Sequence, residues 1–249
     1  MRRKTTAVRI GNVVLSSEEP VLVQSMLNTS TREVDACVEQ AIRIIEAGGR
    51  LVRITAPGVK EAEMLGEIHR RLRERGYTTP ISADIHFVAE AASVAARYVE
   101  KVRINPGNFA DKRATFKKLT YTDEEYAAEL EILRQKFTEF LEVCRQYGTA
   151  VRIGTNHGSL SDRIMSRYGD TPAGMVEATM EYLRVCQACD FKDVVISLKS
   201  SDCRTMVDAV RLLVEKMEAE GMCYPLHLGV TEAGEGEDGR IRSAVGIGT

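Results

Sequence analysis

Short apolar runs rich in Val and Ile alternate with longer amphipathic stretches along most of the chain. Buried parallel strands produce such runs, and helices produce stretches in which apolar residues recur every three or four positions. The pattern predicts seven strands, each followed by or leading into a helix, over residues 21–26, 51–55, 81–86, 102–105, 150–156, 194–199 and 226–231.

Repeated strand–helix units are typical of α/β folds with a parallel sheet. Because no Gly-x-Gly-x-x-Gly turn follows the first strand, we predict a TIM-type (β/α)8 barrel rather than a doubly wound sheet. A complete barrel of this type has eight strands. We therefore expect the barrel, residues 21–249, to be truncated after strand seven, which leaves two edge strands in need of cover.

Residues 1–20 follow a different pattern. β-branched residues within positions 6–15 flank Gly11 and Asn12, a pair that favours a two-residue hairpin turn. We expect residues 1–20 to form an amino-terminal β-hairpin that caps the barrel.

The sequence also marks where helices begin and end. Ser30 with Glu33, and Thr122 with Glu125, have the spacing of capping boxes, and the glycines at positions 48, 148 and 221 fit left-handed helix ends. In the helix predicted after residue 122, one buried face is indicated by apolar residues every three or four positions: Tyr126, Leu130, Leu133, Phe137, Leu141 and Cys144.

Composition narrows the classes of function. The 249 residues are 44% hydrophobic and 28% charged, and 34 Lys and Arg against 36 Asp and Glu leave a net charge of −2, which argues against duplex nucleic acid as a partner. No apolar run is long enough to span a membrane, and six scattered cysteines fit reduced thiols in a cytoplasmic protein. Cys186 and Cys189 have the spacing of a metal or redox pair, but we favour a position at the end of a core helix.

The strongest signal is a cation that recurs at equivalent positions of four predicted strands. Arg53, Arg103 and Arg152 each lie between a Val and an Ile, and Lys199 ends the sixth strand. Since side chains alternate faces along a strand, the aliphatic neighbours point to the helices and the cations point into the barrel. The same alternation turns further polar side chains inward: Gln24, Ser82, Asp84, His86, Asn105, Asn156 and His227.

Two explanations of these cations compete. Ion pairs with Asp84 and Glu232 would give the cations a structural role, but two carboxylates cannot neutralise four cations. An unpaired buried cation is costly, so the excess charge favours an anionic ligand, and guanidinium groups suit phosphate oxygens. We predict a phosphate or diphosphate ligand.

Polar residues at the carboxyl ends of the predicted strands fit the position of chemistry in barrel enzymes. These residues are Asn105, Asn156, Lys199 and Glu232. Asp84 and His86 share one inward face and serve either substrate orientation and proton transfer or a structural hydrogen-bonded pair. Glu232 is either a proton donor or a solvated loop glutamate.

Several strings of residues in fixed order resemble the 4-hydroxy-3-methylbut-2-enyl diphosphate synthase family, iron–sulfur enzymes of the non-mevalonate isoprenoid pathway. The resemblance runs from about Arg2 to the last residue, and the segments at 156–158 and between Phe109 and Gly148 are similar to the larger, plant-like branch. The strings are Val-Gln-Ser-Met at 23–26, Val-Arg-Ile at 52–54, Ala-Asp-Ile-His at 83–86, Val-Arg-Ile-Asn-Pro-Gly-Asn at 102–108, Arg-Ile-Gly-Thr-Asn-His-Gly-Ser-Leu at 152–160, Pro-Leu-His-Leu-Gly-Val-Thr-Glu-Ala-Gly at 225–234 and Ser-Ala-Val-Gly-Ile-Gly at 243–248.

This resemblance implies an oxidoreductase whose barrel binds 2-C-methyl-D-erythritol 2,4-cyclodiphosphate. Asn156 would contact this substrate, and Glu232 would act as the acid near the reacting carbons. The diphosphate would be held by Arg53, Arg103, Arg152 and Lys199. We also count Asn105, Asp84, His86 and His227 among the candidate substrate-binding residues.

The resemblance also implies a cofactor and partners. A [4Fe-4S] cluster on a separate carboxyl-terminal domain would supply two electrons for ring opening and loss of water, and ferredoxin or flavodoxin would donate them. We expect the cluster domain and the plant-like insertion domain to lie beyond residue 249, with no metal ligand in this chain. We expect the chain alone to be inactive and the protein to be a homo-oligomer, without membrane or nucleic-acid partners.

Two other interpretations remain. Another phosphate-binding barrel, such as a pterin-type synthase, would bind a pterin diphosphate. A non-catalytic module would use the barrel as a scaffold for other domains or a partner subunit, and any ligand binding would then not depend on Lys199.

Overall fold

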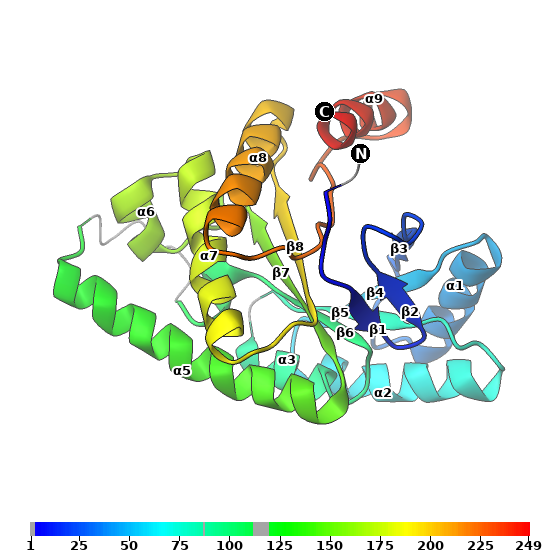
Figure 1. Ribbon diagram of the computed structural model, residues 1–249. Helices are drawn as coiled ribbons and strands as arrows, with labels where there is room; N and C mark the ends of the chain where they lie inside the picture. The colour runs from blue at the N-terminus through cyan, green and yellow to red at the C-terminus, as the bar shows by residue number, and fades with distance from the viewer. Residues whose placement is uncertain (1–2, 87, 112–119) are drawn as a thin grey trace. The chain divides into compact units, whose positions relative to one another are not determined.

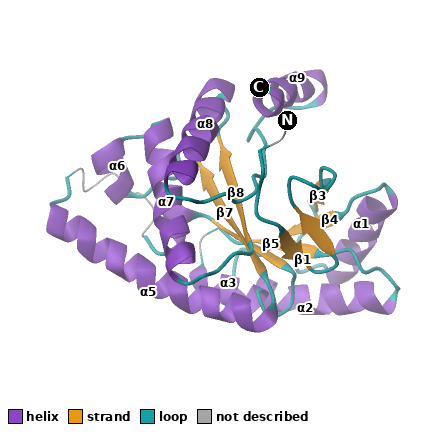
Figure 2. Cartoon of the chain, viewed as in Figure 1, coloured by secondary structure: helices purple, strands orange, loops and turns teal. Residues whose placement is uncertain are grey.

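The computed structural model describes residues 3–86, 88–111 and 120–249 (Figure 1). Strands and helices alternate along most of this length, as Figure 2 shows by colour. In chain order the elements are β1 (Val8–Ile10), β2 (Val13–Leu15), β3 (Gln24–Met26), α1 (Val34–Glu46), β4 (Leu51–Thr55), α2 (Val59–Glu74), β5 (Ile81–Asp84), α3 (Ala89–Ala95), β6 (Lys101–Ile104), α4 (Pro106–Phe109), α5 (Asp123–Tyr147), β7 (Ala150–Asn156), α6 (Asp162–Tyr168), α7 (Pro172–Ala188), β8 (Val194–Lys199), α8 (Cys203–Ala219) and α9 (Gly236–Gly248).

Strands β3 to β8 form one sheet in which each strand lies beside the next strand of the chain. The pairs β3–β4, β4–β5 and β5–β6 are parallel, and at least one helix follows every strand of the sheet. A parallel sheet with sequential strand order and a helix after each strand is the arrangement of a TIM-type barrel. The predicted fold class is therefore confirmed.

The chain forms two compact units. Unit 1 comprises Met1–Ile104, Glu139–Arg152 and Phe191–Val194, and unit 2 comprises Asn105–Thr138, Ile153–Asp190 and Val195–Thr249. In unit 1, α2 packs against α1 and α3, and these helices contact β4, β5 and β6. In unit 2, α7 packs against α6 and α8, and α8 packs against α9.

The amino-terminal hairpin is present as predicted. β1 and β2 pair antiparallel, with Ile10 opposite Val13, and the intervening Gly11 has the left-handed φ of 56° that a tight turn requires. Val8 and Ile10 are fully buried, so the hairpin packs its apolar face against the rest of unit 1.

Of the two predicted capping boxes, one is confirmed. At the start of α5, the Thr122 amide donates to the Glu125 carboxylate at 2.9 Å and the Glu125 amide donates to the Thr122 hydroxyl at 3.2 Å. The box predicted at Ser30 is wrong. There the Glu33 amide donates to the Ser30 carbonyl oxygen at 2.9 Å, and the resulting turn delays the start of α1 to Val34.

The other predicted helix features hold. Gly48, Gly148 and Gly221 have left-handed φ angles of 95°, 68° and 72°. The predicted apolar face of α5 is buried, except that Leu130 is half-buried. Cys186 is buried in α7 and Cys189 follows the end of that helix, in agreement with the helix-end interpretation.

The seventh strand predicted over residues 226–231 is wrong. Only Leu226 forms a β-bridge, with Ile196 of β8, while the Ile196 amide donates to the Pro225 carbonyl and the His227 amide donates to the Ile196 carbonyl. Beyond this bridge the side chain of Lys199 occupies the space beside Gly229, with Cε and Nζ each 3.2 Å from where a Cβ would lie. The pairing with β8 therefore ends after one residue. The helix expected after this segment is present as α9.

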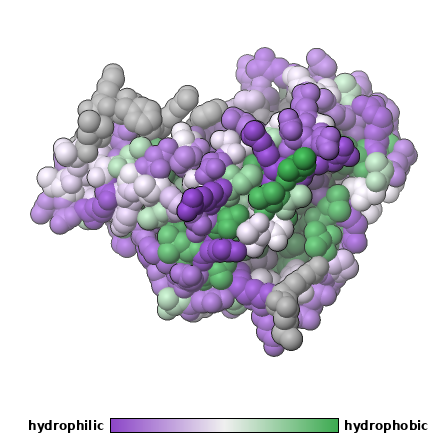
Figure 3. All heavy atoms as spheres, turned by 90° about the horizontal axis from the view of Figure 1, so that it is seen from above, coloured by the Kyte–Doolittle hydropathy of each residue, from purple (hydrophilic) through white to green (hydrophobic). Residues whose placement is uncertain are grey.

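Apolar side chains also reach the surface of each unit. Val21 and Val23 beside β3 are 76% and 58% exposed, and Ile241 and Val245 of α9 are 55% and 52% exposed. Figure 3 shows a face on which hydrophobic surface, in green, interrupts the hydrophilic surface. No helix of the described ranges has both the length and the apolar composition needed to cross a membrane.

Candidate functional site

Three neighbouring strands and the loop after β5 bring charged side chains together in unit 1. The carboxylate of Asp84, at the end of β5, forms ion pairs with Arg53 of β4 and with Arg103 of β6, the latter with 3.2 Å between Oδ1 and Nη1. The Nε2 atom of His86 lies 3.2 Å from Asp84 Oδ2 and 2.8 Å from Arg103 Nη1. Asp84 thus holds two of the predicted cations and the predicted histidine around one carboxylate.

The acidic centre of this cluster is buried, while His86 at its edge is 31% exposed. Asp84 and Arg152 are 1% exposed and Arg103 is 2% exposed. Burial raises the pKa of Asp84, but the hydrogen bond with His86 and the charges of Arg103 and Arg53 outweigh burial and hold that pKa well below its usual value. The carboxylate is therefore ionised at neutral pH.

Arg152, in β7, adds a further cation to the cluster. Burial lowers the pKa of Arg152 well below its usual value, and the charges of Arg53 and Arg103 lower it further, with Asp84 opposing them. Burial also lowers the pKa of Arg103. At Arg152 the charges of Arg53 and Arg103 together exceed the opposing charge of Asp84, which favours a negative charge at that position.

Sequence reasoning missed a buried cation of the sheet, Lys101 at the start of β6. Its Nζ donates to Gln24 Oε1 of β3 at 2.9 Å, and Lys101 is 2% exposed. The contact joins two strands that have β4 and β5 between them, so this part of the sheet curves with the polar face inside. Since Lys101 lies two residues before Arg103, the alternation along the strand was the signal that could have found it.

Unit 2 holds the predicted asparagines. Asn105 caps α4 and is 2% exposed, and its Nδ2 donates to the Ser159 hydroxyl at 3.1 Å. The same hydroxyl donates to the carbonyl of Asn156, the last residue of β7, at 3.1 Å. Within the described part of the chain no hydrogen bond involves the half-buried Asn156 carboxamide, which leaves it available to a ligand. Ser159 is a second residue that the sequence analysis missed.

The other predicted residues of unit 2 lie on β8 and on the segment after it. Lys199 ends β8, and its carbonyl accepts from the His157 amide at 2.9 Å. His227 is half-buried and follows the bridge to β8. Glu232 is exposed in a turn and has a left-handed φ of 52°, which is strained for a residue with a side chain. The predicted residues therefore form one tight cluster in unit 1 and a looser set in unit 2.

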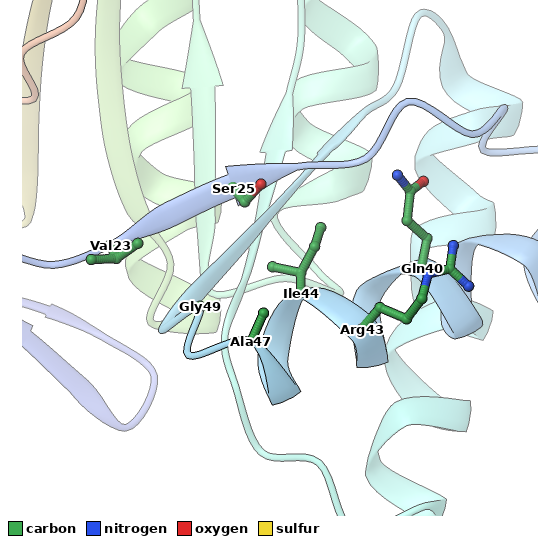
Figure 4. Close-up of a pocket in the computed structure, with 7 residues that line it drawn as sticks. All are labelled: Val23, Ser25, Gln40, Arg43, Ile44, Ala47 and Gly49. Atoms are coloured by element: carbon green, nitrogen blue, oxygen red, sulfur yellow. The ribbon is translucent and has the colours of Figure 1, made fainter. Parts of the chain in front are cut away.

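A cavity of about 310 Å³ lies elsewhere in unit 1, between β3 and α1. Figure 4 shows that Val23 and Ser25 line it from the strand, and Gln40, Arg43, Ile44 and Ala47 line it from the helix. Because side chains alternate along β3, this cavity lies on the opposite face of the strand from Gln24 and the cations. We therefore place the candidate site at the cation cluster and not in this cavity.

The residues of the described ranges offer no site for a metal cluster. No group of three or more His, Cys, Asp or Glu side chains among them could hold a metal ion. None of the six cysteines, all of which lie in the described ranges, forms a disulfide, and Cys37, Cys144 and Cys186 are buried. Burial raises the pKa of the Cys144 thiol, which makes it a poor ligand or nucleophile.

Known proteins resemble the chain closely in sequence. Over 248 residues, all of this chain and 41% of the relative, it is 62% identical to 4-hydroxy-3-methylbut-2-en-1-yl diphosphate synthase (flavodoxin) of Parabacteroides distasonis. It is 51% identical over 249 residues, 34% of the relative, to the chloroplastic, ferredoxin-type enzyme of Arabidopsis thaliana. The chain thus spans less than half the length of these curated relatives.

Comparison of folds and families agrees with the sequence relatives. The solved structure of a type I 3-dehydroquinate dehydratase from Clostridium difficile aligns with this chain with a TM-score of 0.54, over 89% of this chain and 79% of the dehydratase chain. The sequence identity is 8%, so this similarity shows the fold alone. The GcpE TIM-barrel domain family matches residues 5–249. Because this match covers nearly the whole chain, the chain belongs to the GcpE TIM-barrel domain family, and the buried cation cluster lies on the strands of its barrel domain.

Proposed function

We propose that this chain is the substrate-binding barrel of a reductive synthase that converts 2-C-methyl-D-erythritol 2,4-cyclodiphosphate into 4-hydroxy-3-methylbut-2-enyl diphosphate. The names of the relatives supply the product. The observation that carries the proposal is the charge on the sheet. The six strands β3 to β8 contain five cationic residues and one acidic residue, Asp84.

The cation cluster of unit 1 is suited to the diphosphate of this substrate. Asp84 forms ion pairs with Arg53 and Arg103, and the charges of these two arginines oppose that of Arg152, so a multiply charged anion beside the three guanidinium groups would relieve their mutual repulsion. Guanidinium groups bind phosphate oxygens in a bidentate manner, and their rigid planar form suits a fixed ligand position. Asp84 and His86 act here by orienting the arginines.

Residues of unit 2 enter the proposal through the family resemblance. Lys199 would add a further phosphate contact, and the Asn156 carboxamide would contact the substrate. Glu232 would act as the proton donor, which suits an exposed carboxylate on the turn at the end of the segment that follows β8. Asn105 and His227 would complete the polar surroundings.

The reaction needs electrons that this chain does not provide. We propose that a [4Fe-4S] cluster supplies them when bound, that its ligands lie on other parts of the full-length protein, and that flavodoxin or ferredoxin reduces it. The names of the relatives support these two donors. We further propose that the chain alone is inactive, and that the full-length protein is homo-oligomeric and works in the cytoplasm.

Two alternatives make different predictions. A pterin-type synthase would bind a pterin diphosphate in preference to the cyclic diphosphate. A scaffold module would bind neither with any dependence on the strand cations. The relatives named as diphosphate synthases favour the reductive synthase over both.

Calorimetric titration of the full-length protein with the cyclic diphosphate tests the proposal. We expect binding that weakens with salt and weakens at least about tenfold in Lys199→Ala, because a charged hydrogen bond to phosphate is lost. Arg70→Ala, on the exposed face of α2, is the matched control and should leave the affinity unchanged. An affinity for the cyclic diphosphate that changes neither with salt nor in Lys199→Ala would refute the proposal. A preference for a pterin diphosphate would refute it as well.

A further inference from the structure

A short turn follows β7 and carries the Asn156 carboxamide, which the proposed function assigns to the substrate. The Ser159 amide donates to the Asn156 carbonyl oxygen at 3.2 Å, and the Ser159 hydroxyl donates to the same oxygen at 3.1 Å. Gly158, the third residue of the turn, has a left-handed φ of 78°, as a type II turn requires at this position. The direction in which the Asn156 side chain leaves the end of β7 therefore depends on the conformation of this turn.

Asp170, in the link between α6 and α7, contacts this turn through its side chain and its backbone. Its Oδ1 atom accepts from the Gly158 amide at 3.3 Å and lies 3.3 Å from Nε2 of His157. The same Nε2 atom lies 3.3 Å from the carbonyl oxygen of Asp170. Because both oxygens are acceptors, Nε2 carries the hydrogen, and Asp170 thus binds the two central residues of the turn.

The link that carries Asp170 is itself fixed at both ends. α6 ends at Gly169, which has a left-handed φ of 69°. α7 begins after Thr171, whose hydroxyl donates to the Tyr168 carbonyl at 2.8 Å and accepts from the Gly174 amide at 3.2 Å. Since the link is anchored to both helices, Asp170 has a defined position from which it can restrain the turn after β7.

A contribution to stability alone is a poor explanation of the contacts that Asp170 makes. The side chains of Asp170 and His157 are 37% and 29% exposed, and charged contacts that solvent reaches contribute little to stability. Two further contacts restrain the same turn, and both come from predicted substrate-binding residues. Asn105 donates to the Ser159 hydroxyl at 3.1 Å, and the Lys199 carbonyl accepts from the His157 amide at 2.9 Å.

We propose that Asp170 is a positioning residue of the site, which restrains the turn after β7 so that the Asn156 carboxamide is oriented before the substrate binds. The inference rests on the proposed function and extends it to a residue between two helices. A side chain that is oriented in advance loses less conformational freedom on binding, so a loosened turn lowers the affinity. Asp170 acts through Asn156, and no proton or electron transfer is assigned to it.

A double-mutant cycle of Asp170→Ala and Asn156→Ala tests the proposal, with the affinity of the full-length protein for the cyclic diphosphate measured by calorimetry. Asp170→Ala should weaken binding by about three- to tenfold when Asn156 is present, a loss equivalent to one hydrogen bond. When Asn156 is already Ala, the same change should weaken binding by less than about twofold, because residues that act through one another are not additive.

Two control variants accompany the cycle. Asp170→Asn keeps an acceptor oxygen for the Gly158 amide and should retain most of the affinity, and a loss as large as that in Asp170→Ala would contradict the role of these hydrogen bonds. Asp123→Ala removes another exposed aspartate of unit 2, which pairs with Arg167, and should leave the affinity unchanged. Should Asp170→Ala not fold, Asp170→Ser completes the same cycle.

The outcomes separate this inference from the proposed function. If Asn156→Ala weakens binding and Asp170→Ala does not, Asp170 is not a positioning residue and this inference alone is wrong. It is also wrong if Asp170→Ala weakens binding equally in both backgrounds, because Asp170 then acts independently of Asn156. If the wild-type protein does not bind the cyclic diphosphate, the proposed function fails and this inference fails with it.

Discussion

Asp84 is the carboxylate on which the unliganded cation cluster depends, and its replacement by asparagine is the clearest perturbation of that cluster. The variant keeps the shape of the side chain and one acceptor oxygen but removes the charge. With 3.2 Å between Asp84 Oδ1 and Arg103 Nη1, and an effective dielectric constant of about 20, the attraction amounts to about 5 kcal/mol. Arg53 pairs with the other carboxylate oxygen, and hydrogen bonds to the asparagine recover part of the loss.

We therefore expect Asp84→Asn to lose about 3–5 kcal/mol of unfolding free energy, the cost typical of breaking a buried ion pair from one side. Urea unfolding of the full-length protein, combined with hydrogen exchange of the β4, β5 and β6 amides, measures the loss and locates it. Glu67→Gln is the matched control, because it removes the same charge from an exposed pair with Arg70 on α2. An Asp84→Asn protein as stable as wild type would refute the charge balance described for the cluster.

The same variant should respond differently to acid. The pKa of Asp84 is held below its usual value in the folded protein, so the ionised carboxylate stabilises the fold at neutral pH. Its contribution is complete above the ordinary aspartate pKa near 4 and is lost as the pH falls from there through the lower pKa of the folded state. The stability difference between wild type and Asp84→Asn should therefore shrink in acid, and a difference that stays constant would contradict the assignment.

Three further predictions concern unit 2. In Gly107→Ala the new Cβ would lie 1.8 Å from the Ser159 carbonyl oxygen, so α4 must move away from the segment that contains Ser159. Urea unfolding should show a loss of about 1–3 kcal/mol, whereas Gly248→Ala should show none. Ser159→Ala leaves the buried Asn105 amide without its acceptor, so it should cost about 1–3 kcal/mol of unfolding free energy and should weaken substrate binding in calorimetry, while an unchanged affinity would remove Ser159 from the site. Arg163→Met leaves the Glu181 carboxylate buried without its bidentate partner and should cost about 3–5 kcal/mol in urea unfolding. Replacing both residues by Met should restore only part of this loss, because Asp111 and Tyr126 also lose a partner.

The sequence predicted the sheet well because its strands are buried on both faces. A strand of a parallel sheet that is buried on both faces appears in the sequence as a short apolar run. In β4, β6 and β7 a single arginine interrupts this run, and Arg53, Arg103 and Arg152 thereby showed which residues of each strand face inward. The long helix α5 was equally predictable, since its apolar spacing and its capping box agree.

Features that depend on local geometry were harder to predict. The segment after residue 226 has the composition of a strand, but only Leu226 pairs with β8, and Lys199 fills the space at Gly229. The spacing of Ser30 and Glu33 fits a cap, but a backbone turn uses the same residues differently. Alternation alone could identify Lys101 as inward-facing, but nothing in one sequence says that its partner is Gln24, three strands away.

The most direct test of the account is a crystal structure of the full-length protein with the cyclic diphosphate bound. We expect phosphate oxygens within hydrogen-bonding distance of Arg53, Arg103 and Arg152, on the same face of the sheet as Asp84. A substrate whose phosphates lie away from these arginines, for example in the cavity between β3 and α1, would contradict it.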